Sequence, residues 1–375
     1  MLPYGRQWID EADIAAVTEV LTSDWLTTGP WVRDFERALA ARGQAAHAVS
    51  CTSGTAALHM AYAAAGIGPG DEVITTPLTY VATASGAMHC GATVVFADIE
   101  EDTGNLDPAA VEAAVSTRTT VITAVDYAGQ PADMDRLTAI AHRIGALTVE
   151  DAAHSVGSTY KGRPVGSLAD LTAFSFFPTK NMTTAEGGAV LTDDDMLAAR
   201  ADEFHKIGVS RDRSTYRHPD EGTWWYEVPS IGLNYRLSDV HAALGLSQLG
   251  RLADFTARRA ALFARYREAL AGVDGLRLPA VRSWAEPTWH LYPVRILGGR
   301  RREVFDKLRE AGIGVQVNYI PVYWHPVFED LGYRRGMCPK AEQYYREEIS
   351  LPMFARLSYD EQDRVIEVLR GILGA

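Results

Sequence analysis

The sequence has few of the features that disulfide-rich, metal-binding, membrane-bound and nucleic-acid-binding proteins require. Its three cysteines, Cys51, Cys90 and Cys338, are too few and too scattered for a disulfide framework or a zinc cage. A formal net charge of −12 over 375 residues argues against non-specific binding to nucleic acid or an anionic membrane. There is no uninterrupted apolar run of about 18 residues and no N-terminal signal-peptide pattern. We therefore expect a soluble, unprocessed cytoplasmic protein that has no metal site and no nucleic-acid or membrane partner.

Alternating strand and helix patterns fill the first half of the chain. Strand–turn–helix units cover residues 47–65, 69–99 and 119–155, after an N-terminal helix headed by Asp10. Strands and helices that alternate in this way pair in parallel through right-handed crossovers, which predicts a doubly wound, mostly parallel α/β sheet.

A different pattern follows, and it indicates a second, smaller domain. Two amphipathic helices are predicted over 232–272, the first opened by Ser238. They are followed by an α+β pattern, with strands over 290–297 and 314–323 and a final helix over 360–373. We place the boundary near residue 250, which gives a large α/β domain (1–250, with an N-terminal arm) and a small α+β domain (251–375).

Two residues between 147 and 190 carry the clearest chemistry. Asp151 ends one apolar run, and Lys180 follows a second, apolar-aromatic run. Both runs are predicted to be buried strands whose carboxyl ends open into one crevice. A lysine in an apolar pocket has a lowered pKa and can form a Schiff base, and an aspartate can keep a pyridine nitrogen protonated. These are the two groups that pyridoxal phosphate needs from a protein.

Other candidate residues lie at predicted turns, and each has a structural alternative. Ser53, Gly54 and Thr55 begin a helix, where they form either a phosphate site or a simple cap. Tyr80 follows a strand and either covers a flat ring or sits at the edge of the core. Tyr127 likewise ends a strand, beside small residues that permit close approach.

Two irregular segments are candidate ligand loops. The turn around Thr28 is either a ligand-contacting loop or a connector. Residues 204–231 combine cations with aromatic side chains, which suits a diphosphate with an attached base and sugar, although charged loops are often simply solvated. The members of this stretch are Lys206, Arg211, Arg213, Arg217, Tyr216, Trp224, Trp225 and Tyr226.

The order of these motifs resembles that of the DegT/DnrJ/EryC1/StrS sugar aminotransferases of fold type I. The resemblance runs through LTTGP, SGTAALHMA, TTPLTYVATA, VDYAGQPADMD, VEDAAHSVGSTYKG, FSFFPTKNMTTAEGGAV, GLNYRLSDVHAALGLSQL and EISLPMF. Within the family, the segments DYAGQPADMD, FSFFPTKNMTTAEGGA and HLYPVRI look most like the C4-aminotransferases of nucleotide-linked 4-keto-6-deoxy sugars, especially the transaminase of pseudaminic acid synthesis.

The resemblance implies roles for individual residues. Lys180 would anchor pyridoxal phosphate and move protons, and Asp151 would pair with the ring nitrogen. Tyr80 would stack on the ring, and His154 would approach its phenolic oxygen. The phosphate ligands would be Ser53, Gly54, Thr55, Ser175 and, across a homodimer interface, Asn234 of the other subunit. The residues implied near the substrate are Thr28, Tyr127, Lys206, Arg211, Arg213, Tyr216, Asn318 and Tyr319. Asn318 and Tyr323 stand where many relatives have histidines, so the resemblance leaves substrate identity open.

The activity implied is a two-step transamination at C4 of a nucleotide-linked 4-keto-6-deoxy sugar. L-Glutamate would load the cofactor as pyridoxamine phosphate, and the keto sugar would then take the amine. The alternatives are a C3-aminotransferase or a dehydratase acting on a dTDP-linked keto sugar, and a non-catalytic regulator that binds the cofactor. Lys180 argues against the dehydratase, whose relatives carry histidine at that position.

Overall fold

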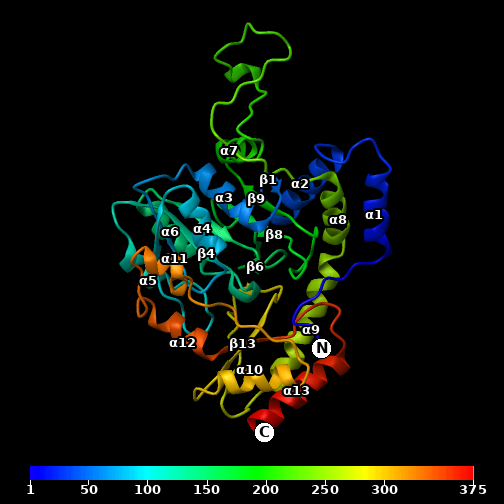
Figure 1. Cartoon of the computed structure of the whole chain (residues 1–375), viewed down its shortest axis with the longest axis vertical. Helices are drawn as coiled ribbons and strands as arrows, with labels where there is room; N and C mark the ends of the chain where they lie inside the picture. The colour runs from blue at the N-terminus through cyan, green and yellow to red at the C-terminus, as the bar shows by residue number, and fades with distance from the viewer. Residues whose placement is uncertain (375) are drawn as a thin grey trace.

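The computed structural model describes residues 1–374, and its helices and strands are shown in Figure 1. The helices are α1 (Glu11–Leu21), α2 (Pro30–Gly43), α3 (Gly54–Ala65), α4 (Ala82–His89), α5 (Pro108–Ala114), α6 (Met134–Arg143), α7 (Asp195–His205), α8 (Asp239–Gly250), α9 (Leu252–Ala269), α10 (Arg301–Glu310), α11 (Pro326–Asp330), α12 (Pro339–Glu347) and α13 (Tyr359–Leu373). The strands are β1 (His47–Cys51), β2 (Glu72–Thr75), β3 (Thr93–Phe96), β4 (Thr119–Val125), β5 (Leu147–Asp151), β6 (Thr159–Tyr160), β7 (Arg163–Pro164), β8 (Leu171–Ser175), β9 (Gly188–Thr192), β10 (Leu276–Arg277), β11 (Ala285–Glu286), β12 (Tyr292–Ile296) and β13 (Glu348–Leu351).

A seven-stranded sheet forms the centre of the larger part of the molecule. Its order is β1-β9-β8-β5-β4-β2-β3. The strands from β8 through β5, β4 and β2 to β3 run parallel, whereas β9 is antiparallel to both β8 and β1. The prediction of a doubly wound, mostly parallel sheet is confirmed.

Helices cover both faces of this sheet, and alternate strand residues contribute to the two resulting cores. Val73 belongs to the core that includes α3 and α4, whereas its neighbour Ile74 belongs to the core on the other face, which includes α2 and α6. Val121 and Ile122 of β4 divide in the same way. This two-sided burial explains why apolar residues occur at adjacent positions of these strands and do not simply alternate with polar ones.

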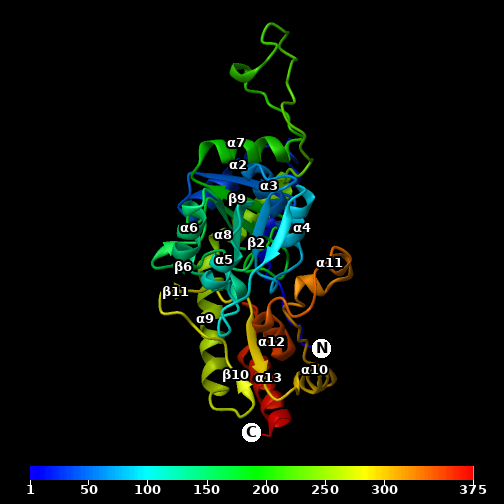
Figure 2. The same ribbon diagram turned by 90° about the vertical axis from the view of Figure 1, so that its left-hand side faces the viewer.

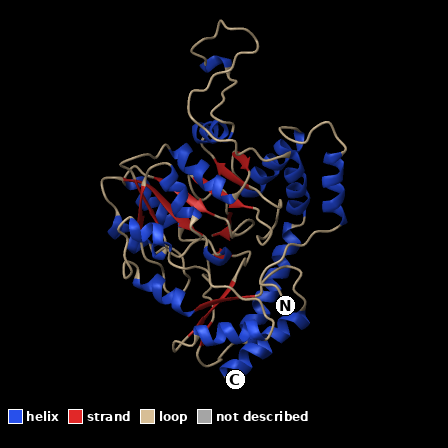
Figure 3. Cartoon of the chain, in the orientation of Figure 1, coloured by secondary structure: helices blue, strands red, loops and turns tan. Residues whose placement is uncertain are grey.

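A third core lies nearer the C-terminus, around a smaller sheet of order β10-β12-β13 (Figure 3). Helices α9, α10 and α13 contribute to this core, and so does Leu2 of the N-terminal arm. Helix α8 instead packs on α1 and α2. The chain therefore changes partners between α8 and α9, close to the boundary proposed near residue 250, which stays a prediction.

One predicted strand is wrong. Residues 314–323 form no strand, and only Gln316 pairs, through an isolated bridge to Ser350 of β13. The segment instead turns toward the large sheet, where Val322 donates its backbone N–H to the Pro77 carbonyl. Its apolar residues are divided, because Val315 belongs to the third core whereas Val322 and Tyr323 are buried in the first.

Residues 206–234, here called the arm, leave the body beyond α7 in both Figure 1 and Figure 2. Isolated bridges join Lys206 to Asn234 at its base and Ser210 to Glu227 further out. Apart from a short 3-10 turn over Arg213–Thr215 it is irregular, as predicted. Within residues 1–374, no helix has both the length and the apolar character needed to cross a bilayer.

Candidate active site

The carboxyl ends of strands β5 and β8 border a cavity of about 360 Å³. The two strands are parallel neighbours, with Asp151 at the end of one and Ser175 at the end of the other. Ligands of open α/β sheets bind at this edge, and the volume is that of a small-molecule site. Asp151 and Lys180 both line this cavity. The structure thus brings together the two residues on which the sequence prediction depends.

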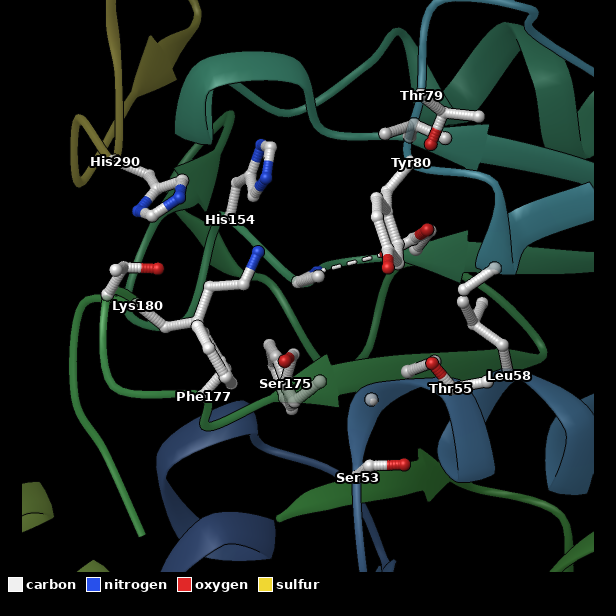
Figure 4. A pocket seen from close by; sticks show the side chains of 18 of the residues that line it. Ser53, Thr55, Leu58, Thr79, Tyr80, His154, Ser175, Phe177, Lys180 and His290 are labelled. Atoms are coloured by element: carbon white, nitrogen blue, oxygen red, sulfur yellow. Dashed lines mark hydrogen bonds between the residues drawn. The ribbon is translucent and has the colours of Figure 1, made fainter. Parts of the chain in front are cut away.

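Lys180 enters the cavity from the loop that follows β8. Its side chain is partly buried, and its amine lies on the same side of the cavity as His154 and His290 (Figure 4). Burial lowers the pKa of Lys180 to about 8, against a smaller opposing effect of the Asp151 charge. The predicted downward shift is confirmed, and the neutral amine is accessible near physiological pH.

Asp151 is buried and held by two donors. Its Oδ2 accepts a hydrogen bond from Thr83 Oγ1 at 2.7 Å, and its Oδ1 accepts one from the Ala153 N–H at 3.2 Å. Burial raises the pKa of Asp151, and these hydrogen bonds oppose that shift. Thr79, which lines the cavity, lies 2.7 Å from Thr83 Oγ1 and completes a short hydroxyl chain. The chain fixes the carboxylate and orients it.

The N-terminus of α3 forms another wall of the cavity, opposite Lys180 (Figure 4). Ser53 caps this helix by accepting the Ala56 N–H at 3.1 Å, as predicted from the sequence. Gly54 is required here, because a Cβ at that position would lie 2.6 Å from Cβ of Ser175. The close approach leaves the first amides of α3 beside Ser175 and Thr55, where the helix dipole favours an anion.

Aromatic rings line the remaining side. His154 Nε2 is 3.0 Å from the hydroxyl of Tyr319, and the His154 ring lies 4.3 Å from that of His290. Burial lowers the pKa values of both histidines well below the usual range, and the nearby Lys180 charge adds to the shift. Both rings are therefore neutral. Tyr80 stands at the rim, exposed, with its ring 6.4 Å from that of Tyr319.

These residues fit pyridoxal phosphate. The cavity offers an amine for the aldehyde, a fixed carboxylate for the ring nitrogen and a helix N-terminus for the phosphate. His154 lines the cavity, and its Nδ1 is buried without a hydrogen-bond partner in residues 1–374. The exposed face of Tyr80 is suited to covering a flat ring.

Several residues predicted to contact the ligand do not line this cavity. They are Thr28, Tyr127, Lys206, Arg211, Arg213, Tyr216 and Asn234, whereas Asn318 and Tyr319 do line it. Tyr127 is buried behind the wall and donates its hydroxyl to the Asn318 carbonyl. Thr28 is exposed, and the others, including the exposed Asn234, belong to the arm. Their roles in binding stay predictions.

The cavity also contains residues that sequence reasoning missed. They include Tyr4, Thr79, Phe177, Glu186 and His290. Phe177 and Glu186 lie within the run around Lys180, so their position in the sequence was a usable signal. Tyr4 and His290 reach the cavity from distant parts of the chain, and no local pattern marks them.

Comparisons with known proteins find related aminotransferases. Residues 7–370 match the model of the DegT/DnrJ/EryC1/StrS aminotransferase family. The chain is 44% identical over 378 residues to the spore coat polysaccharide biosynthesis protein SpsC of Bacillus subtilis, covering 99% of this chain and 97% of that protein.

Two solved structures have the same fold over the whole chain. The putative sugar aminotransferase Spr1654 of Streptococcus pneumoniae, solved in PMP and PLP forms, superposes in its PMP form with a TM-score of 0.93 at 33% identity. This covers 100% of our chain and 99% of that one. PseC of Helicobacter pylori, an aminotransferase involved in the biosynthesis of pseudoaminic acid, gives 0.92 at 31% identity with coverage of 100% and 99%.

Proposed function

The chain belongs to the DegT/DnrJ/EryC1/StrS aminotransferase family, and from this premise we propose that it transfers the amino group of L-glutamate to C4 of a nucleotide-linked 4-keto-6-deoxy sugar. It is a pyridoxal-phosphate-dependent aminotransferase. The keto-sugar substrate, the C4 position and the nucleotide carrier are our proposal.

One observation carries the proposal: Lys180 and Asp151 line the same cavity as the N-terminus of α3. The similarity to PseC supports an amino-sugar product, since PseC is involved in making pseudoaminic acid. The relationship to a spore coat polysaccharide biosynthesis protein points to the same class of chemistry.

Pyridoxal phosphate, when bound, supplies a reactive aldehyde and a ring that acts as an electron sink. Lys180 would hold it covalently and, once released, take and return a proton at the reacting carbon, a task suited to an amine whose pKa is about 8. Asp151, oriented by Thr83, would keep the ring nitrogen protonated. Most of the contacts that bind the cofactor would come from residues that take no part in the reaction.

The phosphate would be held by the hydroxyl groups of Ser53, Thr55 and Ser175 and by the amides at the start of α3. Tyr80 would cover one face of the ring. His154 would place its Nδ1 toward the phenolic oxygen, since its Nε2 is already paired with Tyr319. Each assignment uses a group that has no other partner or lies on the cavity wall.

We further propose that the enzyme is a homodimer with shared sites. Asn234 would reach the partner's phosphate, and the arm would bind the nucleotide through Lys206, Arg211, Arg213 and Tyr216. Thr28 would complete the substrate region, and Tyr127 would support it from behind the wall through its hydrogen bond to the Asn318 carbonyl. Remote contacts of this kind would orient C4 toward the amine. The three cysteines are unpaired, which supports a reducing compartment, and we place the reaction in the cytoplasm.

A substrate panel tests the proposal. Purified enzyme loaded with pyridoxal phosphate and given L-glutamate should aminate a UDP- or dTDP-linked 4-keto-6-deoxy sugar, with the product and its position identified by mass spectrometry and NMR. Lys180→Ala should lose both turnover and the visible absorbance of the covalently held cofactor. Amination at C3 alone would contradict the C4 assignment, and a fully active Lys180→Ala enzyme would contradict the mechanism.

A further inference from the structure

The first residues of the chain are fixed against the wall of the active-site cavity. Leu2 donates its N–H to the Gly312 carbonyl and accepts the N–H of Gly314, both at 2.8 Å. A Cβ at Gly314 would lie 2.7 Å from the Leu2 carbonyl oxygen, so this close approach requires glycine. Two residues later, the Tyr4 carbonyl accepts the N–H of Met353 at 3.2 Å. Tyr4 thereby becomes part of the cavity lining.

The hydroxyl of Tyr4 can donate a hydrogen bond to a ligand. It accepts a hydrogen bond from Asn318 Nδ2 at 2.8 Å, but within residues 1–374 its own O–H finds no acceptor. The second hydrogen on Asn318 Nδ2 goes to Ser350 Oγ at 3.0 Å. Burial raises the pKa of Tyr4 above its usual value, so the phenol stays protonated.

Asn318 supplies an acceptor beside that donor. Asn318 Nδ2 donates both to the Tyr4 hydroxyl and to Ser350 Oγ, which orients the amide nitrogen toward these two hydroxyl groups. In the described part of the chain, no group donates to Asn318 Oδ1. The cavity wall therefore presents an O–H and a carbonyl oxygen, linked through one hydrogen bond.

A donor beside an acceptor selects for a particular class of ligand. A sugar hydroxyl or an acetamido group can both accept from Tyr4 and donate to Asn318. A carboxylate has no proton to donate to Asn318 Oδ1, so it could satisfy only the Tyr4 donor. The pair thus suits the neutral sugar better than the carboxylates of the amino donor.

We propose that Tyr4 and Asn318 form a subsite that binds a neutral hydroxyl or amide group of the sugar, with Tyr4 as hydrogen-bond donor. The inference rests on the proposed function, because it takes the second substrate to be a keto sugar. It assigns a part in substrate selection to the N-terminal segment that carries Tyr4, which is distinct from the arm over 206–234.

The test separates the two half-reactions of the cofactor-loaded enzyme. In Tyr4→Phe, the rate constant for reaction with L-glutamate should stay within about twofold of wild type. The second-order rate constant for the glutamate-treated enzyme with a UDP-linked 4-keto-6-deoxy-N-acetylhexosamine should fall by about tenfold, the effect of one hydrogen bond. Cofactor absorbance and the melting temperature report that the variant is folded.

The matched control is Tyr333→Phe, which removes a hydroxyl that donates to the Val94 carbonyl away from the cavity. It should leave both half-reactions unchanged. Asn318→Ala provides a second variant and should show the same selective loss. Equal sugar reactivity in wild type and both variants would overturn the subsite, as would a loss confined to the glutamate step. If wild type itself aminates no keto sugar, the proposed function fails instead.

Discussion

At the scale of single residues, the cavity holds Lys180 at a cost in stability. Its pKa of about 8 lies below the ordinary 10.5, so the folded state binds the extra proton less tightly than the unfolded state does. The destabilisation is complete below pH 8, decreases as pH rises from 8 to 10.5, and is absent above that range. The gap corresponds to roughly 3 kcal/mol, or about 2 kcal/mol after allowing for partial exposure of the side chain.

We therefore expect cofactor-free Lys180→Met to be more stable than cofactor-free wild type at pH 7, by about 2 kcal/mol. The advantage should shrink between pH 8 and pH 10, as measured by urea unfolding at each pH. Lys307→Met, at an exposed lysine paired with Glu303, serves as the control, and its effect should stay within about 0.5 kcal/mol. A Lys180→Met advantage that does not change with pH would show that the lysine is not desolvated.

The residues of the site differ in how far the sequence predicts them. Asp151 and Ser175 were predictable because each ends a strand in a sheet whose parallel strands share one edge. Thr83 was not, since its hydrogen bond to Asp151 spans 68 positions of the chain. Tyr4 lies further still, 314 positions from Asn318. Local patterns identify reactive groups but not the distant residues that orient them.

At the scale of elements, the start of α3 depends on close contact with β8. The absence of a side chain at Gly54 lets the helix approach Ser175, so Gly54→Ala should push the helix N-terminus away from the phosphate position. Overpacking of this kind costs about 1–3 kcal/mol. We expect cofactor affinity to fall by about tenfold or more, measured by fluorescence titration of the cofactor-free protein.

Gly371→Ala is the control for that substitution. It lies within α13, and an added Cβ there meets nothing within 4 Å. It should raise stability by about 0.5–1 kcal/mol through helix propensity and leave cofactor affinity unchanged. Unaltered affinity in Gly54→Ala would show that the α3 N-terminus does not bind the phosphate.

Helices and strands were predicted correctly where the hydrophobic period of a segment and its length indicated the same kind of element. The start of α8 at Ser238 followed from its cap, and the central strands from their apolar runs. Residues 314–323 were predicted as a strand from their β-branched and aromatic content, yet they cross from the small sheet to the cavity wall. There, tertiary contacts outweigh propensity.

At the scale of the whole molecule, large exposed apolar side chains lie in two places, at the cavity rim and on the arm. Tyr80 and Phe177 at the cavity rim are 62% and 46% exposed, and Trp224 and Ile231 on the arm are 77% and 88% exposed. Large apolar side chains that stay exposed are typical of binding surfaces. In the proposed homodimer, a two-fold interface would present each arm to the other subunit and could cover both groups.

Subunit mixing tests that arrangement. Lys180→Ala should be inactive, and Asn234→Asp should be nearly so, because its carboxylate would repel the phosphate. If Asn234 serves the partner's site, a mixed dimer contains one site with both residues intact. Refolding equal amounts together should then restore about a quarter of wild-type activity, since half of the dimers are mixed and each has one working site. If Asn234 served its own subunit, every site in the mixture would carry one of the two defects, and no activity would return.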